Sequence, residues 1–285
     1  MKKNLKFLAI ALLVIFVDES FSQGKINVMS FNIRYDNPKD GADQWQFRKK
    51  NLASMLPFYD VEICGMQEVL FNQAEDLKSL LPDYNYVGVG RTDGKKDGEF
   101  SPIFYDTKKL TLLESQTFWL SPTPEIPGKA WDAMLPRIVT WAKFKYKDSS
   151  KGKKPFYFFN THFDHMGQEA RRESAKLLLS KVKEIAGNQP AVITGDFNAT
   201  PTDEPTIILN AGLIDTKKVS KNPHFGPDDS TFNGFEAKEI PGRLIDFIFL
   251  NNNKIKVIKH ATLSNTWAGK FPSDHHAVMV RLDFD

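Results

Sequence analysis

The chain has 285 residues, of which 41% are hydrophobic and 26% are charged, an ordinary balance for a globular protein with a sizeable core. Its 38 basic and 35 acidic residues leave a formal net charge of only +3. This argues against a dedicated nucleic-acid-binding protein, because such proteins carry a clear basic excess. The single cysteine, Cys64, excludes an internal disulfide bond, and its apolar neighbours predict a small core residue.

The N-terminus has the pattern of a secretory signal peptide. Three lysines within the first six residues precede eleven apolar residues, 7–17, and Ser20 and Ser22 then stand at the spacing of a cleavage site. The alternative is a membrane anchor, but a helix that spans a bilayer needs about 20 apolar residues. We therefore expect residues 1–22 to be removed. Residues 23–285 would form a mature protein that is secreted or periplasmic and has no transmembrane segment.

Beyond this segment, short runs rich in Val, Ile, Phe and Tyr alternate with helical patterns. The longest helical pattern has apolar residues at intervals of three or four and ends before Gly187, a typical stop signal. In chain order, we expect a strand at Ile26–Phe31, a helix at Phe47–Leu56, a strand at Val61–Met66, a helix at Phe71–Leu80, strands at Tyr84–Val89, Pro102–Tyr105, Leu110–Trp119, Val139–Tyr146 and Phe156–Asn160, a helix at Gln168–Ala186, a strand at Ala191–Thr194, a helix at Glu204–Asn210, and strands at Leu244–Leu250, Ile255–Leu263 and Ala277–Leu282.

This order of elements indicates a mixed α/β fold built in layers, because strands and helices alternate early and strands dominate the C-terminal part. No repeat, linker or low-complexity tract divides residues 23–285, so we expect one domain. The polar stretches Lys147–Lys154 and Lys217–Asp229 are expected to be solvent-exposed loops. We take a monomer as the default oligomeric state.

Several apolar runs end in a side chain that can form hydrogen bonds or bind a metal. In layered α/β folds, strand ends at one edge bring polar groups together on a rigid scaffold, so we expect these side chains to converge on one site. They are Asn32, Glu68, His162, Asp196, Asn198, Asp246, Asp274 and His275.

The residue types in this set favour one kind of chemistry. Carboxylate and asparagine oxygens are hard ligands that suit Mg²⁺, Mn²⁺ or Ca²⁺, and the sequence has no cysteine cluster for zinc or iron. A histidine contacts a phosphate oxygen when protonated and acts as a base when neutral. An aspartate beside an asparagine can orient and deprotonate water. The set is typical of metal-assisted attack of water on a phosphoryl group.

Each residue also has a structural interpretation. Asn32 could be a turn former after a strand, and Glu68 could pair with a surface lysine. His162 could be a core histidine with satisfied hydrogen bonds, and Asp246 could be a buried capping carboxylate. Outside the set, we expect structural roles for His165 and His276 and surface positions for His224 and His260.

Six short motifs resemble, in order, those of the endonuclease/exonuclease/phosphatase superfamily, and together they cover essentially the whole mature chain. They are Met29–Asn32, Gly65–Val69, Asn160–His162, Gly195–Asn198, Ile245–Ile248 and Ser273–His275. The resemblance implies a four-layered α/β sandwich of the DNase I type, in which helices flank two packed mixed β-sheets. It also implies a divalent-metal-dependent hydrolase of phosphate esters.

The resemblance assigns three residues to a metal site. Glu68 is similar to the principal metal ligand of the family, with Asn32 beside it and Asp274 near the metal. The implied cofactor is Mg²⁺ or Mn²⁺.

Five further residues resemble the catalytic group of the family. Asp196 would activate or orient the attacking water, and Asn198 would align the water or the phosphate. His162 resembles the phosphate-contacting histidine. His275 resembles the second active-site histidine, and Asp246 its carboxylate partner or a further metal contact. The division of acid and base work between Asp196 and His275 stays open.

Arginines and two loops bear on the substrate. We expect Arg34 and Arg137 to bind substrate, because a guanidinium grips phosphate in a bidentate fork, and Arg91 and Arg243 to be solvated surface residues. The loops Trp131–Arg137 and Thr231–Phe235 would either wall a pocket or tuck onto the core.

Arg34 also bears on the choice of phosphate ester. Abasic-site endonucleases of the resembled superfamily commonly have an acidic residue two positions after the first motif's asparagine, where this chain has Arg34. The membrane-docking apolar hairpin of bacterial sphingomyelinases is not found in the sequence. Both departures favour a small phosphorylated molecule, a sugar or inositol phosphate, or a lipid head group, and nucleic acid is possible but not favoured.

Three function hypotheses follow from the sequence. The first is an exported phosphomonoesterase or phosphodiesterase that acts on small or lipid-derived esters. The second is a secreted nuclease, whose binding should weaken steeply with salt. The third is a non-catalytic binding module, which the intact set of charged motif residues argues against.

Overall fold

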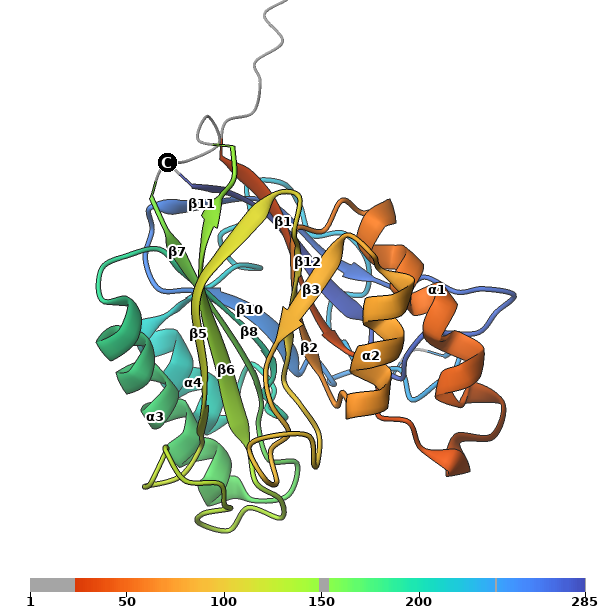
Figure 1. Cartoon of the computed structure of the whole chain (residues 1–285), viewed down its shortest axis with the longest axis horizontal. Helices are drawn as coiled ribbons and strands as arrows, with labels where there is room; N and C mark the ends of the chain where they lie inside the picture. The colour runs from red at the N-terminus through yellow and green to blue at the C-terminus, as the bar shows by residue number, and fades with distance from the viewer. Residues whose placement is uncertain (1–23, 149–153, 239, 285) are drawn as a thin grey trace, which may run out of the picture.

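Two β-sheets pack face to face and carry helices on their outer sides (Figure 1). The computed structural model describes residues 24–148, 154–238 and 240–284, so the predicted signal peptide and most of the predicted loop Lys147–Lys154 lie outside the described residues. Within the described part, every helix is too short or too polar to cross a membrane.

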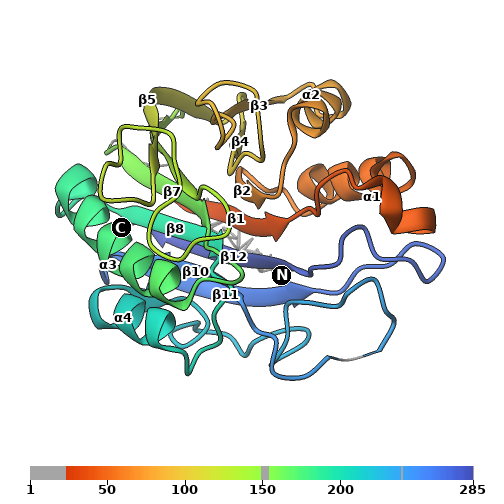
Figure 2. The same ribbon diagram turned by 90° about the horizontal axis from the view of Figure 1, so that it is seen from below.

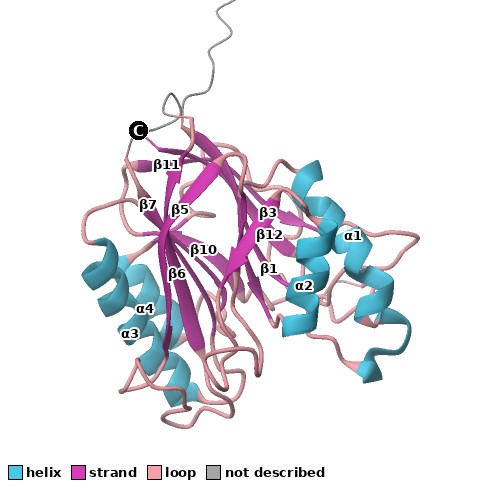
Figure 3. Cartoon of the chain, viewed as in Figure 1, coloured by secondary structure: helices cyan, strands magenta, loops and turns pink. Residues whose placement is uncertain are grey.

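The first sheet has six strands, with one parallel pair, β1 and β2, and antiparallel pairing elsewhere. The helices α1 (Trp45–Phe58) and α2 (Phe71–Leu80) cover its outer face, and the short 3-10 helix η1 (Pro38–Asp43) leads into α1 (Figure 3). In sheet order the strands are β11 (Ile255–Leu263), β12 (Ala277–Phe284), β1 (Lys25–Asn32), β2 (Ile63–Gln67), β4 (Ile103–Asp106) and β3 (Tyr84–Val87).

The second sheet also has six strands, and its one parallel pair is β7 with β8. The helices α3 (Gln168–Ala186) and α4 (Glu204–Gly212) cover its outer face, on the opposite side of the molecule from α1 and α2 (Figure 2). In sheet order the strands are β5 (Leu110–Trp119), β6 (Ile138–Tyr146), β7 (Phe156–His162), β8 (Ala191–Asp196), β10 (Asp246–Leu250) and β9 (Ile214–Asp215). The four-layered sandwich of two mixed sheets is therefore confirmed.

The strands read as nearly continuous apolar runs because both faces of each sheet are covered. Successive side chains of a strand point to opposite faces. Val28 and Phe158 accordingly pack in the core between the sheets. Met29 packs against the helices of the first sheet, and Phe159 against those of the second. This double burial accounts for the abundance of phenylalanine.

A small polar network joins the two sheets directly below their strand ends. The Asn160 side chain donates to the carbonyl of Met66 at 2.6 Å and accepts from Gln67 Nε2 at 2.7 Å. Gly65 lies against it, and a Cβ at this position would stand 2.1 Å from Thr194 Oγ1, a distance that only glycine avoids. The network fixes β2 relative to β7, and hence Glu68 relative to the residues that follow β7.

Most expected elements are present, and the differences are small but informative. The bounds of α2, α3, β5 and β11 are as expected, whereas η1 and β9 were not predicted. Strands β7 and β8 run past their expected ends to His162 and Asp196, because the parallel ladder continues until these two residues face each other. The last pair of that ladder brings two site residues side by side.

The surface position expected for His260 is wrong. A β-bulge between Val257 and Lys259 shifts the alternation of β11, so His260 points inward and is buried. His224 is half-buried, and its Nδ1 lies 2.9 Å from Nδ1 of His260. The two rings hold the loop that starts at Lys217 onto the edge of the sheet.

Acidification should destabilise the fold through His260. Burial, and then the charge of His224, lower the pKa of His260 from 6.5 to about 3, so the unfolded chain binds this proton first. The stabilising contribution is complete above pH 6.5 and is lost as pH falls toward 3, by at most about 1.4 kcal/mol per pH unit. We expect urea denaturation between pH 7.5 and 4.5 to show a steeper loss for the wild type than for His260→Gln. The matched variant His224→Gln, which leaves His260 buried, should keep the steep dependence; equal slopes for the wild type and His260→Gln would contradict this.

Candidate active site

A pocket of about 410 Å³ opens at the strand ends where the two sheets meet. Most of the predicted site residues line it, and they come from both sheets. Asn32 and Asp246 are buried beneath it and contact the residues that line it. The predicted residues in the wall are Arg34, Glu68, Arg137, His162, Asp196, Asn198, Asp274 and His275.

Glu68 presents a carboxylate to the pocket from the turn after β2. Its φ of 61° is in the left-handed region, which is unfavourable for a residue with a side chain and is typical of positions under functional constraint. Asn32 Nδ2 donates to Glu68 Oε1 at 3.1 Å, and the backbone N–H of Tyr35 donates to Oε2 at 3.2 Å. These contacts fix a carboxylate of the hard-ligand type at the pocket wall.

Asn32 links two carboxylates of the site. Its Nδ2 also donates to Asp196 Oδ2 at 2.9 Å, while its Oδ1 accepts from the backbone N–H of Arg34 at 3.0 Å. In this structure the amide therefore positions Glu68 and Asp196 relative to each other, and its oxygen faces the backbone.

Arg34 is a pocket cation held between acidic groups. Asp40 accepts from its Nε and Nη2, both at 3.0 Å, and the carboxylates of Asp274 and Glu68 lie 3.8 and 4.0 Å from the guanidinium. Burial opposes the charge, but Asp40 and the other two carboxylates outweigh it and raise the pKa of Arg34. One quarter of the side chain stays exposed, so part of this cation is open to a ligand.

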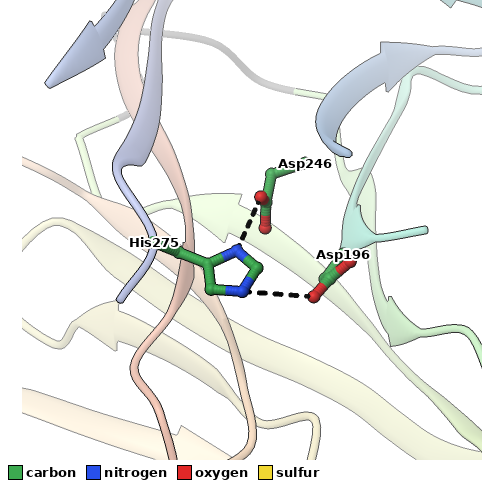
Figure 4. Close-up of side chains that lie close together, drawn as sticks. All are labelled: Asp196, Asp246 and His275. Atoms are coloured by element: carbon green, nitrogen blue, oxygen red, sulfur yellow. Dashed lines mark hydrogen bonds and ion pairs between the residues drawn. The ribbon is translucent and has the colours of Figure 1, made fainter. Parts of the chain in front are cut away.

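His275 stands between two buried aspartates (Figure 4). Its Nδ1 lies 2.9 Å from Asp246 Oδ2, and its Nε2 lies 3.8 Å from Asp196 Oδ2. Burial alone would lower the pKa of His275, but Asp246, Asp196 and Asp274 together raise it to about 10. His275 is thus a protonated imidazolium at neutral pH, and its Nδ1 donates to the carboxylate of Asp246.

Asp196 has a pKa well above that of an ordinary aspartate. Burial, and then the nearby carboxylate of Asp246, raise the pKa of Asp196 to about 7. Its Oδ1 accepts from the backbone N–H of Asn198 at 2.9 Å, which fixes the carboxyl group at the pocket wall. A carboxylate with a pKa near neutral is suited to take a proton from water.

Asp196, Asp246 and His275 also form a group whose ligand atoms lie within 4.8 Å of one another and could hold a metal ion. Their contacts favour a different role. Nδ1 of His275 is engaged with Asp246 and the ring is charged, and an imidazolium has no lone pair for a metal. The carboxylates of Glu68 and Asp274, which both lie near Arg34, offer the hard oxygen atoms that a divalent cation prefers.

His162 is neutral, and its tautomer follows from its neighbours. Burial, and then the charges of Arg137 and Arg91, lower the pKa of His162 well below its usual value. Asn198 Nδ2 donates to its Nε2 at 3.0 Å, so Nδ1 carries the proton. That N–H has no hydrogen-bond partner among the described residues, and Glu99 Oε2 lies 3.8 Å away.

Arg137 is a buried cation at one end of the pocket. Its Nε donates to Asp164 Oδ2 at 3.2 Å, and its Nη2 donates to His165 Nδ1 at 2.9 Å. Its Nη1 is buried and has no partner within the described part of the chain. Two motif-adjacent residues, Asp164 and His165, therefore position a predicted substrate-binding arginine.

The sequence did not predict the positions of three residues at the pocket, Glu99, Arg91 and His165. Glu99 lines the pocket beside His162, but nothing in its segment distinguishes it from the other acidic residues of a charged loop. Arg91 was expected at the surface and is instead buried. Its charge is neutralised by Glu99, whose Oε1 lies 2.8 Å from Arg91 Nη2. His165, expected to be structural, also lines the pocket. His276 has the structural role expected, buried beside Asn233.

The two aromatic-bearing loops do wall the pocket. Leu135 and Phe232 line it, one from each predicted loop. Arg243 is exposed, as expected, but its guanidinium lies over the Phe232 ring at 4.9 Å and lines the pocket mouth. Thr231, in the same loop as Phe232, lies behind the pocket wall. Its hydroxyl donates to Asp246 Oδ2 and helps to hold the carboxylate that orients His275.

This chain is similar to known proteins over most of its length. An endonuclease/exonuclease/phosphatase family protein from Bacteroides thetaiotaomicron is 40% identical, with a TM-score of 0.86 over 92% of this chain and 98% of that chain. A mannosyl-6-phosphatase from the same organism is 40% identical, with a TM-score of 0.85 over 91% of this chain and 100% of that chain. Protein angel from Drosophila melanogaster is 29% identical over 65% of this chain, which spans about half (53%) of that protein.

The family profile described as Endonuclease/Exonuclease/phosphatase family matches residues 29–275, from the first motif to the last. The chain therefore belongs to this family, whose members are hydrolases of phosphate esters.

Proposed function

We propose that this protein is an exported phosphomonoesterase that hydrolyses a small sugar-like phosphate with the help of a divalent cation. The observation that carries the proposal is the convergence of Glu68, Asp196 and His275, from both sheets, on one pocket. The similarity to a mannosyl-6-phosphatase supports the substrate class. The apolar N-terminal segment and its candidate cleavage site support export.

A monoester fits the charges of the pocket. Its terminal phosphate carries up to two negative charges, and besides Arg137, whose charge Asp164 neutralises, three cationic side chains line the walls: Arg34, Arg243 and His275. Carboxylates lie between these cations. They would repel an extended polyanionic strand, but they leave room for one phosphate group. The pocket is concave and of a size that suits a small molecule.

The carboxylates of Glu68 and Asp274 would hold the cation, and Asn32 would keep Glu68 in place. A divalent cation at this position supplies charge stabilisation to the phosphoryl oxygens. Mg²⁺ and Mn²⁺ fit the oxygen donor set.

Residues of the chain would remove the proton from water and stabilise the phosphoryl oxygens, each in a role that follows from its charge. Asp196 takes the proton of the attacking water as the bond from phosphorus to the ester oxygen breaks, and the departing alkoxide is protonated by solvent. The carboxyl group of Asp196 is held in the pocket wall by Asn198 and Asn32. His275, kept charged by Asp246, donates to a phosphoryl oxygen and stabilises the charge that develops on it. Asn198 and His162, which contact each other beside Asp196, align the phosphate.

A substrate panel tests the proposal. We expect residues 23–285 to release phosphate from a hexose 6-phosphate and from p-nitrophenyl phosphate faster than they cleave bis-p-nitrophenyl phosphate, phosphoinositides, plasmid DNA or RNA. The alternative, a secreted nuclease, predicts the reverse order and a steep loss of activity with salt. Cleavage of DNA or RNA with no release of phosphate from either monoester would overturn the proposal.

A further inference from the structure

One end of the pocket contains donors that the protein itself leaves unused. Arg137 is 4% exposed, and its Nη1 has no hydrogen-bond partner within the described residues. The same holds for Nδ1 of His162, which carries a proton. Leaving a buried donor unpaired costs about 1–3 kcal/mol, so two of them in one pocket wall indicate a ligand that accepts both.

An acceptor lies beside these donors. Glu99 Oε2 is 3.8 Å from His162 Nδ1, too far for a hydrogen bond, while Glu99 Oε1 is engaged by Arg91 at 2.8 Å. Three residues keep a polar atom that can still form a hydrogen bond, and all of them line the same pocket: Glu99, Arg137 and His162. The wall thus offers two donors without a partner and, 3.8 Å from one of them, a carboxylate oxygen.

This arrangement does not suit a second anion. Arg137 is neutralised by Asp164 at 3.2 Å, and Arg91 by Glu99 at 2.8 Å, so each cation at this end already has a carboxylate partner. A further phosphate or carboxylate would meet the charge of Glu99 at close range. A neutral group that accepts and donates hydrogen bonds at once fits better, and an alcohol hydroxyl is the simplest such group.

We propose that Glu99, Arg137 and His165 form a hydroxyl-binding subsite that recognises the polyol portion of the phosphate ester. His165 accepts from Nη2 of Arg137 at 2.9 Å and is a positioning residue that sets the direction in which Nη1 points. Substrate hydroxyls accept from Arg137 and donate to Glu99, and His162 adds a donor where the subsite meets the phosphate site. This inference rests on the proposed function and narrows its substrate to a polyol phosphate.

The test compares two substrates of similar size. A hexose 6-phosphate carries ring hydroxyls, whereas cyclohexylmethyl phosphate has the same ester linkage and none. We expect the wild type to prefer the hexose 6-phosphate in kcat/KM by at least about 10²-fold, because a buried site that pairs hydroxyls rejects an analogue lacking them. An inositol phosphate as a third substrate distinguishes sugars from cyclitols.

Variants then assign the preference to residues. Glu99→Gln should reduce the ratio of the two kcat/KM values by about 10-fold or more, mainly through KM for the hexose phosphate, and His165→Ala should act in the same direction. Using a ratio cancels any loss of catalysis that both substrates share through His162. Glu114→Gln, which changes an exposed carboxylate on β5, should leave the ratio unchanged.

The outcomes separate this inference from the proposed function. Equal turnover of both monoesters by the wild type would overturn the hydroxyl subsite and leave the phosphomonoesterase standing. Turnover of neither monoester would overturn the proposed function first. A wild-type preference that both variants preserve would assign recognition of the hydroxyls elsewhere and overturn the roles given to Glu99 and His165.

Discussion

Replacing Asp196 by asparagine is expected to lower kcat by about 10²- to 10⁴-fold, the range for loss of a general acid–base group. The amide keeps the size of the carboxyl group and can still accept from the backbone N–H of Asn198. It cannot accept a proton from water, and it removes the negative charge that faces His275 at 3.8 Å. The effect should therefore fall on turnover more than on KM.

Steady-state kinetics on p-nitrophenyl phosphate, with thermal unfolding measured in parallel, checks this expectation. Asp229→Asn makes the same chemical change on an exposed loop and serves as the control. A variant at Asp196 that keeps near-normal kcat would show that another group takes the proton. The new amide cannot accept from both Asn198 N–H and Asn32 Nδ2, so a modest decrease in unfolding temperature is expected. A variant that loses activity only because it has unfolded would instead be largely unfolded at the assay temperature.

The strand ends were the most predictable part of the site. Apolar runs that end in Asn32, Glu68, His162 or Asp196 mark buried strands, and strand ends of packed sheets meet at one edge. The parallel ladder of β7 and β8 then places His162 opposite Asp196. Local pattern and fold class together were enough to bring these side chains to one pocket.

Other features depended on single distortions or on partners distant in sequence. The bulge in β11 that turns His260 inward has no mark in a stretch of ordinary strand residues. Arg91 is buried only because Glu99, eight residues later, neutralises it. The direction of the Asn32 amide is set by Asp196, 164 residues away. Such contacts exist only after folding, so composition and spacing could not reveal them.

Removing the divalent cation is expected to abolish hydrolysis. The pocket holds Glu68 and Asp274 close to the site for an anionic substrate, and without a bound cation these carboxylates would repel phosphate. Added Mg²⁺ or Mn²⁺ should restore turnover. The variant Glu68→Gln loses a ligand charge, so half of the activity should return only at an Mn²⁺ concentration at least about 10-fold higher than the wild type needs. Changes to the residues around a metal site lower metal affinity by a factor of this order.

The most direct test combines metal binding with turnover on the same samples. Residues 23–285 and Glu68→Gln are stripped with a chelator and titrated with Mn²⁺; electron paramagnetic resonance measures the free ion while release of p-nitrophenol is followed. We expect the wild type to bind Mn²⁺ and regain activity in step with occupancy, with both curves displaced to higher Mn²⁺ in the variant. Full wild-type turnover in excess chelator, or identical binding curves for the two proteins, would contradict a cation held by Glu68 as the centre of the reaction.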